Sequence, residues 1–114
     1  MEKFIADALA FLELARPVTV EIEDDLSLED FGPVDGLCYC HTESHEIYVD
    51  RASSRGLKAT IAHELTHAYV SEQWGEAVEF HGEEFRASAI WIQEAMEALG
   101  HKFAAPVFLV DYDK

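Results

Sequence analysis

The residues with the clearest chemical potential are His63, Glu64 and His67, which stand in the run His63-Glu64-Leu65-Thr66-His67. Positions i and i+4 of an α-helix lie about 40° apart around the axis and about 6 Å apart along it. Two imidazoles with this spacing can bind one metal ion. Glu64 is rotated about 100° from His63, so its carboxylate can reach a water molecule bound to that metal. The spacing therefore predicts a metal site with a carboxylate placed for acid–base chemistry.

The helix that must carry this motif is predicted over residues 54–74, and Gly75 ends it. Residues 57–74 include no Pro and no Gly. Apolar side chains surround most of the axis: Leu57, Ile61, Ala62, Leu65, Ala68, Tyr69 and Val70. Such a helix is buried inside its domain, where imidazole and carboxylate groups need hydrogen bonds or a metal. This setting favours a metal site over a chance match to a short pattern.

A catalytic zinc site binds three protein side chains and leaves one position open to water, so a third ligand is expected downstream. A second long helix is predicted over residues 82–99, with Gly100 as its C-cap. Its apolar stripe consists of Phe85, Ala89, Ile92, Met96 and Leu99. Continued one turn backward, the stripe reaches His81, which we therefore take as the third ligand.

Three carboxylates in the same region, Glu79, Glu83 and Glu84, are the other candidates for this position. Glu83 lies about 160° from the start of the stripe and is expected to face solvent, whereas Glu84 flanks the stripe and is the second choice. The metzincin spacing requires a Gly three and a His six residues after the second ligand, where this chain has Val70 and Gln73. The metzincin pattern therefore does not apply.

The N-terminal part of the chain is predicted to supply a helix and the first strand. Residues 2–15 place apolar side chains on one helical stripe, and Pro17 ends that helix. Residues 18–23 alternate in the manner of a strand. Residues 24–36 are acidic and contain Gly and Pro, so we expect a loop with one helical turn.

Two short strands, 37–41 and 46–50, are predicted to form a hairpin. Residues 103–111 have the apolar character of a terminal extended segment or strand. The predicted fold class is therefore α+β: an N-terminal helix, a small antiparallel sheet, and the motif-bearing helix packed with a second long helix.

Size and composition limit the function classes. We expect one domain, residues 1–114, because the chain is short and 49% apolar. It has no signal peptide at its start and no apolar run of about 18 residues, so we expect a cytoplasmic protein without a membrane partner. Cys38 and Cys40 have no second cysteine pair to complete a structural zinc site, and we expect reduced, half-buried thiols.

The charge is strongly negative, because 23 acidic residues outnumber 8 basic ones and give a net charge of −15. Phosphate binding requires clustered Lys and Arg, so we expect no intrinsic nucleic-acid-binding surface. The simplest interpretation is a solvated acidic surface that keeps the protein monomeric. The alternative is attraction to a basic partner, or mimicry of nucleic-acid charge.

Two motifs taken together resemble a known family. Residues 63–69 read HELTHAY, and residues 81–85 read HGEEF. Their order and spacing resemble the SprT-like zinc metallopeptidases, which include the Spartan proteases. The resemblance extends over about residues 46–91 and includes the strand upstream of the first motif.

The resemblance implies a zincin-like minimal core and an endopeptidase that depends on Zn²⁺. It implies that His63, His67 and His81 bind the zinc and that Glu64 is the general acid/base. Glu64 would take a proton from the metal-activated water and deliver it to the leaving amine. A second electrophile is expected, and the sequence leaves four candidates open: Tyr48, Tyr69, His45 and Arg86.

The strand 46–50 is expected to bind an extended substrate along its edge. Many relatives carry a zinc ribbon or basic DNA-binding segments after the catalytic core, and this chain ends at Lys114 without either. The expected partner is a protein or peptide substrate, with a basic one favoured by the charge, and the sequence leaves open whether DNA-bound proteins are targeted. A minimal acidic core of this kind suggests a phage-encoded or accessory version in the host cytoplasm.

Two other functions stay open. The chain could be a binding protein with a weak or inactive zinc site that acts through its acidic surface, as an inhibitor or nucleic-acid mimic. It could also be a zinc hydrolase of a non-peptide amide. The intact Glu64 favours catalysis, because a purely structural metal site does not need it.

Overall fold

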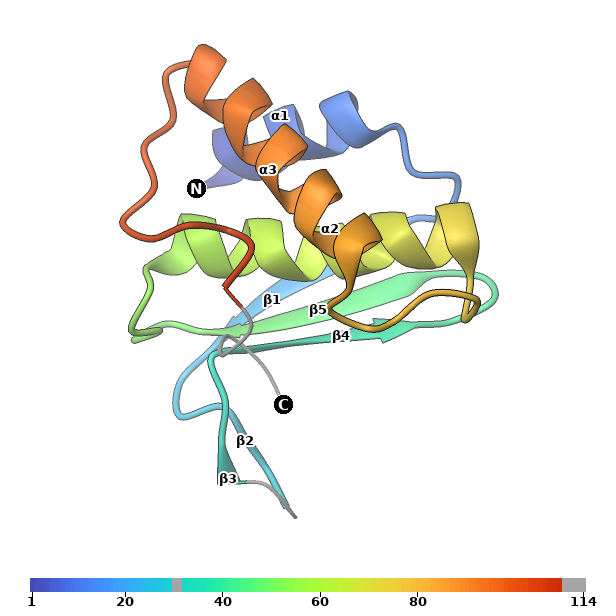
Figure 1. Ribbon diagram of the computed structural model, residues 1–114. Coiled ribbons are helices and arrows are strands. Elements are labelled where there is room, and N and C mark those ends of the chain that lie inside the picture. Colours follow the sequence, from blue (N-terminus) through green and yellow to red (C-terminus); the bar gives the residue numbers. More distant parts are fainter. Residues whose placement is uncertain (30–31, 110–114) are drawn as a thin grey trace.

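The computed structural model describes residues 1–29 and 32–109 and has three layers (Figure 1). One helix, α2, is the middle layer; α1 and α3 pack on one side of it, and a three-stranded sheet packs on the other. The elements of these layers are α1 (Glu2–Leu12), β1 (Val18–Glu23), β4 (Gly36–Cys40), β5 (His45–Asp50), α2 (Leu57–Trp74) and α3 (Glu83–Ala98). This arrangement confirms the predicted α+β class.

The middle position of α2 follows from its apolar circumference. Eleven of its eighteen residues are buried, Ile61 and Leu65 among them. Toward the sheet they meet Ile47 and Val49, and toward the other helices they meet Phe85 in the same core cluster. The predicted burial of the motif is therefore confirmed, because His63, Glu64 and His67 belong to these eleven residues.

The bounds of two helices differ from the prediction. Helix α2 begins at Leu57 instead of residue 54, since Gly56 before it has a φ of 87°, a left-handed conformation that Gly adopts readily. Helix α1 ends at Leu12 instead of residue 15, because the next residue, Glu13, adopts the left-handed conformation with a φ of 49°. Beyond that point the chain turns toward the end of α2 and donates backbone hydrogen bonds to Glu72.

The three-stranded sheet is mixed, with the order β1-β5-β4. The hairpin of β4 and β5 is antiparallel, as predicted. Strand β1 is parallel to β5, so the prediction of a fully antiparallel sheet is wrong for this pair. After β1 the chain crosses to the opposite edge of the sheet, where β4 runs antiparallel to β1. Strand β5 then lies between β1 and β4 and runs parallel to β1.

Three smaller predictions are corrected. Residues 24–36 contain a short antiparallel pair, β2 (Ser27–Leu28) and β3 (Gly32–Pro33), and no helical turn among those described. Strand β5 is central, so both of its edges are already hydrogen-bonded and it cannot bind a substrate by edge pairing. The segment 103–109 contains turns in place of a strand, and residues 110 and 111 lie outside the described residues.

None of the helices that the structure describes combines the length and the apolar character needed to cross a membrane.

Candidate metal centre

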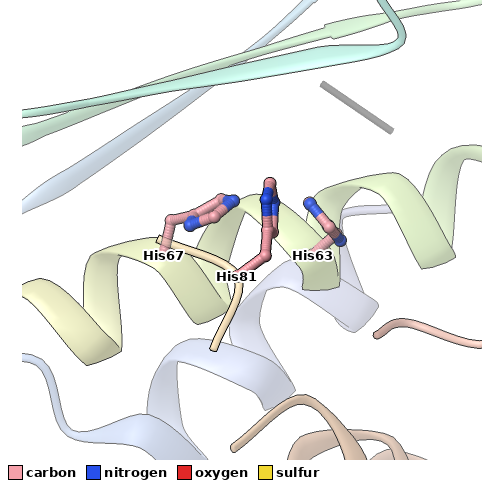
Figure 2. A group of neighbouring side chains, drawn as sticks. All are labelled: His63, His67 and His81. Atoms are coloured by element: carbon pink, nitrogen blue, oxygen red, sulfur yellow. The ribbon is translucent and has the colours of Figure 1, made fainter. Parts of the chain in front are cut away.

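Three histidines meet between α2 and the start of α3 (Figure 2). His63 and His67 come from consecutive turns of α2, and His81 comes from the turn that precedes α3. Their ligand nitrogens all lie within 4.8 Å of one another, a spacing that small side-chain rotations can close around one ion. Among the described residues these three histidines are the group that could hold a metal. The alternatives to His81, namely Glu79, Glu83 and Glu84, do not belong to this group.

The apolar stripe of α3 explains how His81 reaches the other two histidines. Phe85 lies one turn after His81 and is 1% exposed, so it anchors the start of α3 in the core. Its ring centroid lies 4.8 Å from that of His63, 4.4 Å from that of His67 and 5.0 Å from that of His81. Phe85 therefore forms an apolar support under all three imidazoles.

A backbone carbonyl sets the orientation of His63. The Nδ1 atom of His63 donates a hydrogen bond to the carbonyl oxygen of Val107 at 2.8 Å. With the proton on Nδ1, the Nε2 atom carries the lone pair that a metal requires. The N–H of Val107 in turn donates to Oε1 of Gln93 on α3 at 3.0 Å. This contact has no signal in the sequence, because any residue type could supply the carbonyl.

Glu64 lies against the first residue of β4. It is fully buried, and a Cβ atom added to Gly36 would lie 2.9 Å from its Oε2 atom and 2.9 Å from Cγ2 of Thr60. Only Gly leaves room for the strand to approach α2 this closely. Gly36 falls in the loop predicted over residues 24–36, but in the structure it begins β4. A Gly at the start of a strand is the signal in the sequence for such a close approach.

The structure narrows the choice of a second electrophile. Tyr48 alternates with the buried residues of β5, so it faces away from α2, and its O–H donates to Glu46 at 2.9 Å. Tyr69 lies about 200° around the helix from His67, and its ring packs against Trp91. Both tyrosines therefore point away from the three histidines.

The other two candidates are engaged in other contacts. His45 is fully buried and its Nε2 atom lies 2.7 Å from Oε2 of Glu72. The guanidinium carbon of Arg86 lies 4.2 Å from the centroid of the Phe108 ring, close in sequence to Val107. Arg86 therefore packs against the segment whose Val107 carbonyl orients His63.

A pocket of about 360 Å³ opens beside His67. One wall is β4, with Cys38 and Cys40, and another is the segment between α2 and α3. Phe80 of that segment is 61% exposed and stacks on His67, with ring centroids 4.2 Å apart and an angle of 12° between the rings. The pocket provides space for a ligand directly next to the candidate metal ligands.

The comparisons with known proteins identify a family. The model of the SprT-like family matches residues 15–106, a range that includes the three histidines and Glu64. Searches of curated proteins and of solved structures found no match. Because the family match covers most of the sequence, the chain belongs to the SprT-like family.

Proposed function

We propose that this member of the SprT-like family is a zinc-dependent endopeptidase with Glu64 as its general acid and base. The observation that carries the proposal is the group of three histidines with a buried Glu64 on the same helix as two of them. Three imidazoles suit Zn²⁺ and leave a fourth position for water. The hydrogen bond from His63 to Val107 supports this assignment, because metal-binding histidines commonly donate their second nitrogen to a carbonyl or carboxylate.

The chemistry divides between the ion and the protein. Zinc, when bound, supplies Lewis-acid activation of the attacking water and of the scissile carbonyl. Glu64 accepts the proton of the attacking water and passes it to the leaving amine. Its complete burial strengthens these interactions, because the low-dielectric surroundings screen them less than water does. Phe85 keeps water away from the inner side of the imidazoles.

The substrate is proposed to bind along β4. In the described sheet β4 is an edge strand, so an extended peptide can add to it by backbone pairing. Because β4 forms one wall of the pocket beside His67, a peptide bound there can place a side chain in the pocket. Glu76 and Glu79 also line this pocket, and together with the net charge of −15 they favour a basic protein or peptide.

A cleavage assay on basic, loosely folded proteins tests the proposal. We expect the zinc-loaded chain to cleave them and Glu64→Gln to be roughly 10²–10⁴-fold slower, because Gln keeps the shape but cannot accept the proton. Zinc content and thermal unfolding should stay unchanged. Glu94→Gln, a change of the same kind on the exposed face of α3, is the matched control and should cleave like the wild type. Equal cleavage by Glu64→Gln and wild type contradicts the proposal.

The charge favours one alternative, a binding protein that acts through its acidic surface. That function does not need a base, so Glu64→Gln would keep it. Substitution of surface carboxylates by their amides would weaken the binding of a basic partner instead. Glu64→Gln and the surface amide substitutions therefore distinguish a peptidase from an acidic binding protein.

A further inference from the structure

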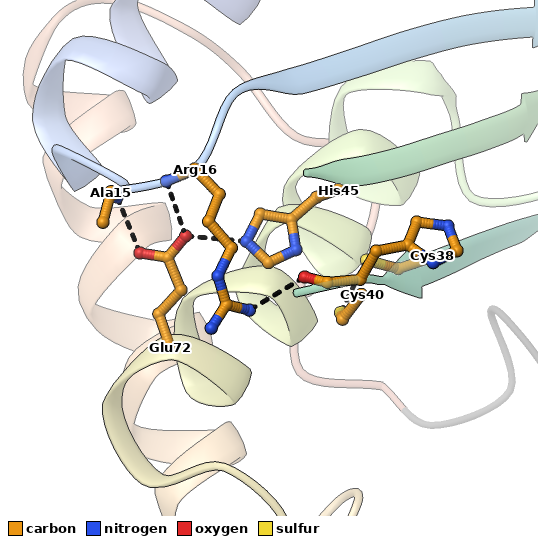
Figure 3. A network of polar contacts seen from close by, with 7 residues as sticks. Ala15, Arg16, Cys38, Cys40, His45 and Glu72 are labelled. Carbon is orange, nitrogen blue, oxygen red and sulfur yellow. Dashed lines mark hydrogen bonds and ion pairs between the residues drawn. The ribbon is translucent and has the colours of Figure 1, made fainter. Parts of the chain in front are cut away.

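A second group of reactive side chains lies at the end of β4, outside the three-histidine site (Figure 3). Cys38 and Cys40 are two residues apart on this strand, so they point to the same face, toward α2 and the pocket. Their sulfur atoms are 3.3 Å apart. Cys40 is exposed and Cys38 is half-buried, so an external reagent can approach Cys40 first.

A buried histidine stands next to Cys40. His45 is its cross-strand partner in the β4–β5 pair and is fully buried. The Nε2 atom of His45 donates to the carboxylate of Glu72 at 2.7 Å, and Figure 3 shows the His45 ring between Glu72 and Cys40. The hydrogen bond to Glu72 fixes the orientation of the His45 ring, and a histidine next to a thiol favours the thiolate.

Glu72 is held in place from a distant part of the chain. Its two carboxylate oxygens accept the backbone N–H groups of Ala15 at 2.7 Å and of Arg16 at 3.1 Å. These bonds, the contact with His45 and the burial of the side chain at the end of α2 leave Glu72 little freedom to turn away. The order carboxylate–imidazole–thiol is therefore built into the packing of α2 against the sheet and against the segment between α1 and β1.

The surroundings favour ionisation of Cys40. The contact with the Cys38 thiol lowers the pKa of Cys40 most, burial raises this pKa, and the neighbouring His45 and Ser71 side chains lower it further, to about 6. Because the thiolate is the nucleophilic form of cysteine, Cys40 is the more reactive thiol of the pair at neutral pH.

We infer that Cys38 and Cys40 form a thiol–disulfide exchange site, in which Cys40 attacks a small disulfide and Cys38 resolves the product. His45 and Glu72 are positioning residues of this site. Its substrate class is a low-molecular-weight disulfide such as oxidised glutathione. The site uses none of the three histidines or Glu64, so this inference and the proposed peptidase can fail separately.

The reaction balances without another reagent. The Cys40 thiolate attacks one sulfur of R–S–S–R, which forms Cys40–S–S–R and releases R–S⁻. The Cys38 thiol gives its proton to that R–S⁻, and its sulfur then attacks the Cys40 sulfur and expels the second R–S⁻. The two cysteines lose two electrons, and the disulfide becomes one thiol and one thiolate.

Strand geometry makes the resulting bridge easy to reduce. Two alternate residues of a strand have Cα atoms about 6.6 Å apart, near the upper end of the range that disulfides span. A bridge between Cys38 and Cys40 therefore requires the strand to pucker, and strained disulfides are the readily reversible ones. Strand β4 can pucker more easily than β5, because it is at the edge of the described sheet.

Mass spectrometry of the full zinc-loaded chain treated with oxidised glutathione tests the assignment of roles. We expect the wild type to form the internal Cys38–Cys40 disulfide. Cys38→Ser should instead trap one glutathione on Cys40, and Cys40→Ser should react at Cys38 at least tenfold more slowly. Equal reaction of the two variants, or no internal disulfide in the wild type, overturns the inference.

The pH dependence of alkylation by iodoacetamide tests the positioning residues. At pH 6 we expect Cys40 to react about tenfold faster than an ordinary cysteine, since its larger thiolate fraction outweighs its lower nucleophilicity. Glu72→Gln and His45→Gln should move the midpoint of the rate profile to higher pH, in folded proteins with unchanged zinc content. Should either variant fail to fold, the wild-type profile decides: a midpoint above about 8, as for an unperturbed thiol, overturns the inference.

Discussion

The Nδ1 atom of His63 and the carbonyl oxygen of Val107 are 2.8 Å apart, although the two residues are 44 positions apart in the chain. A segment without helix or strand thereby orients a candidate metal ligand in the middle of α2. Gln93 holds that segment in turn, because its Oε1 atom accepts the N–H of Val107 at 3.0 Å. The geometry of the candidate metal centre therefore depends on residues outside the group of three histidines.

We predict that Gln93→Leu lowers zinc affinity. The substitution removes the acceptor for the Val107 N–H and so loosens the carbonyl that orients His63. Loss of a hydrogen-bond partner of a metal ligand commonly lowers metal affinity 10–100-fold. Because Gln93 acts through Val107, we expect roughly a tenfold lower zinc affinity in Gln93→Leu. Competition with a zinc-binding dye measures it. Gln93→Glu keeps an acceptor oxygen and should bind zinc nearly as well as the wild type; equal loss in both variants would contradict the prediction.

We predict that Gly36→Ala slows peptide cleavage and leaves zinc content unchanged. The new Cβ would lie 2.9 Å from both Oε2 of Glu64 and Cγ2 of Thr60, so the carboxylate must move while the histidines do not. We expect a 10–100-fold lower rate and a loss of about 1–3 kcal/mol of stability from overpacking. Adding Thr60→Ser removes the clash with Cγ2 of Thr60 and should restore part of the cleavage rate and part of the stability. Unchanged kinetics in Gly36→Ala would show that Glu64 does not need its present position.

We predict that zinc stabilises the fold. A ligand present at about 100 times its Kd adds about 2.7 kcal/mol to the free energy of unfolding, which shifts the Tm of a domain of this size by roughly 10 °C or more. Thermal unfolding with and without a chelator measures this shift, and added zinc should reverse it. In His81→Ala the shift should be much smaller, because one ligand is missing. The same shift in both proteins would mean that His81 is not a ligand.

We predict that the contribution of Glu72 to stability depends on pH. Burial raises the pKa of Glu72, but hydrogen bonds from Ala15, His45 and Arg16 outweigh it and hold the pKa below the ordinary value of 4.5. A lowered pKa in the folded state means that the ionised form stabilises the fold above that ordinary value. This stability is lost as the pH falls through the pKa of the folded state.

Urea unfolding of wild type and Glu72→Gln measures this dependence. The variant should be less stable near neutral pH, and the difference should shrink as the pH falls below about 4.5, where the wild-type carboxyl also becomes neutral. A difference that is independent of pH would mean that the loss comes from packing instead of charge.

Local patterns were sufficient to place the three helices, most of the main sheet and the three histidines that lie together. The i, i+4 spacing of His63 and His67 and the stripe that leads from Phe85 back to His81 are properties of single helices. They depend on a helical period that holds in any tertiary context. The structure brings these three histidines together, and the family match covers them.

The contacts that complete the site depend on tertiary structure. The sequence by itself determined that α2 is a buried helix carrying a metal-binding pattern, because that follows from neighbouring residues. Only the packing decided that β5 is central, that Gly36 borders Glu64, that Val107 orients His63 and that Glu72 meets His45. Each of these contacts joins residues far apart in the chain, and several use backbone groups or an absent side chain. Such contacts leave no periodic signal in the sequence, because they arise only when the layers pack against one another.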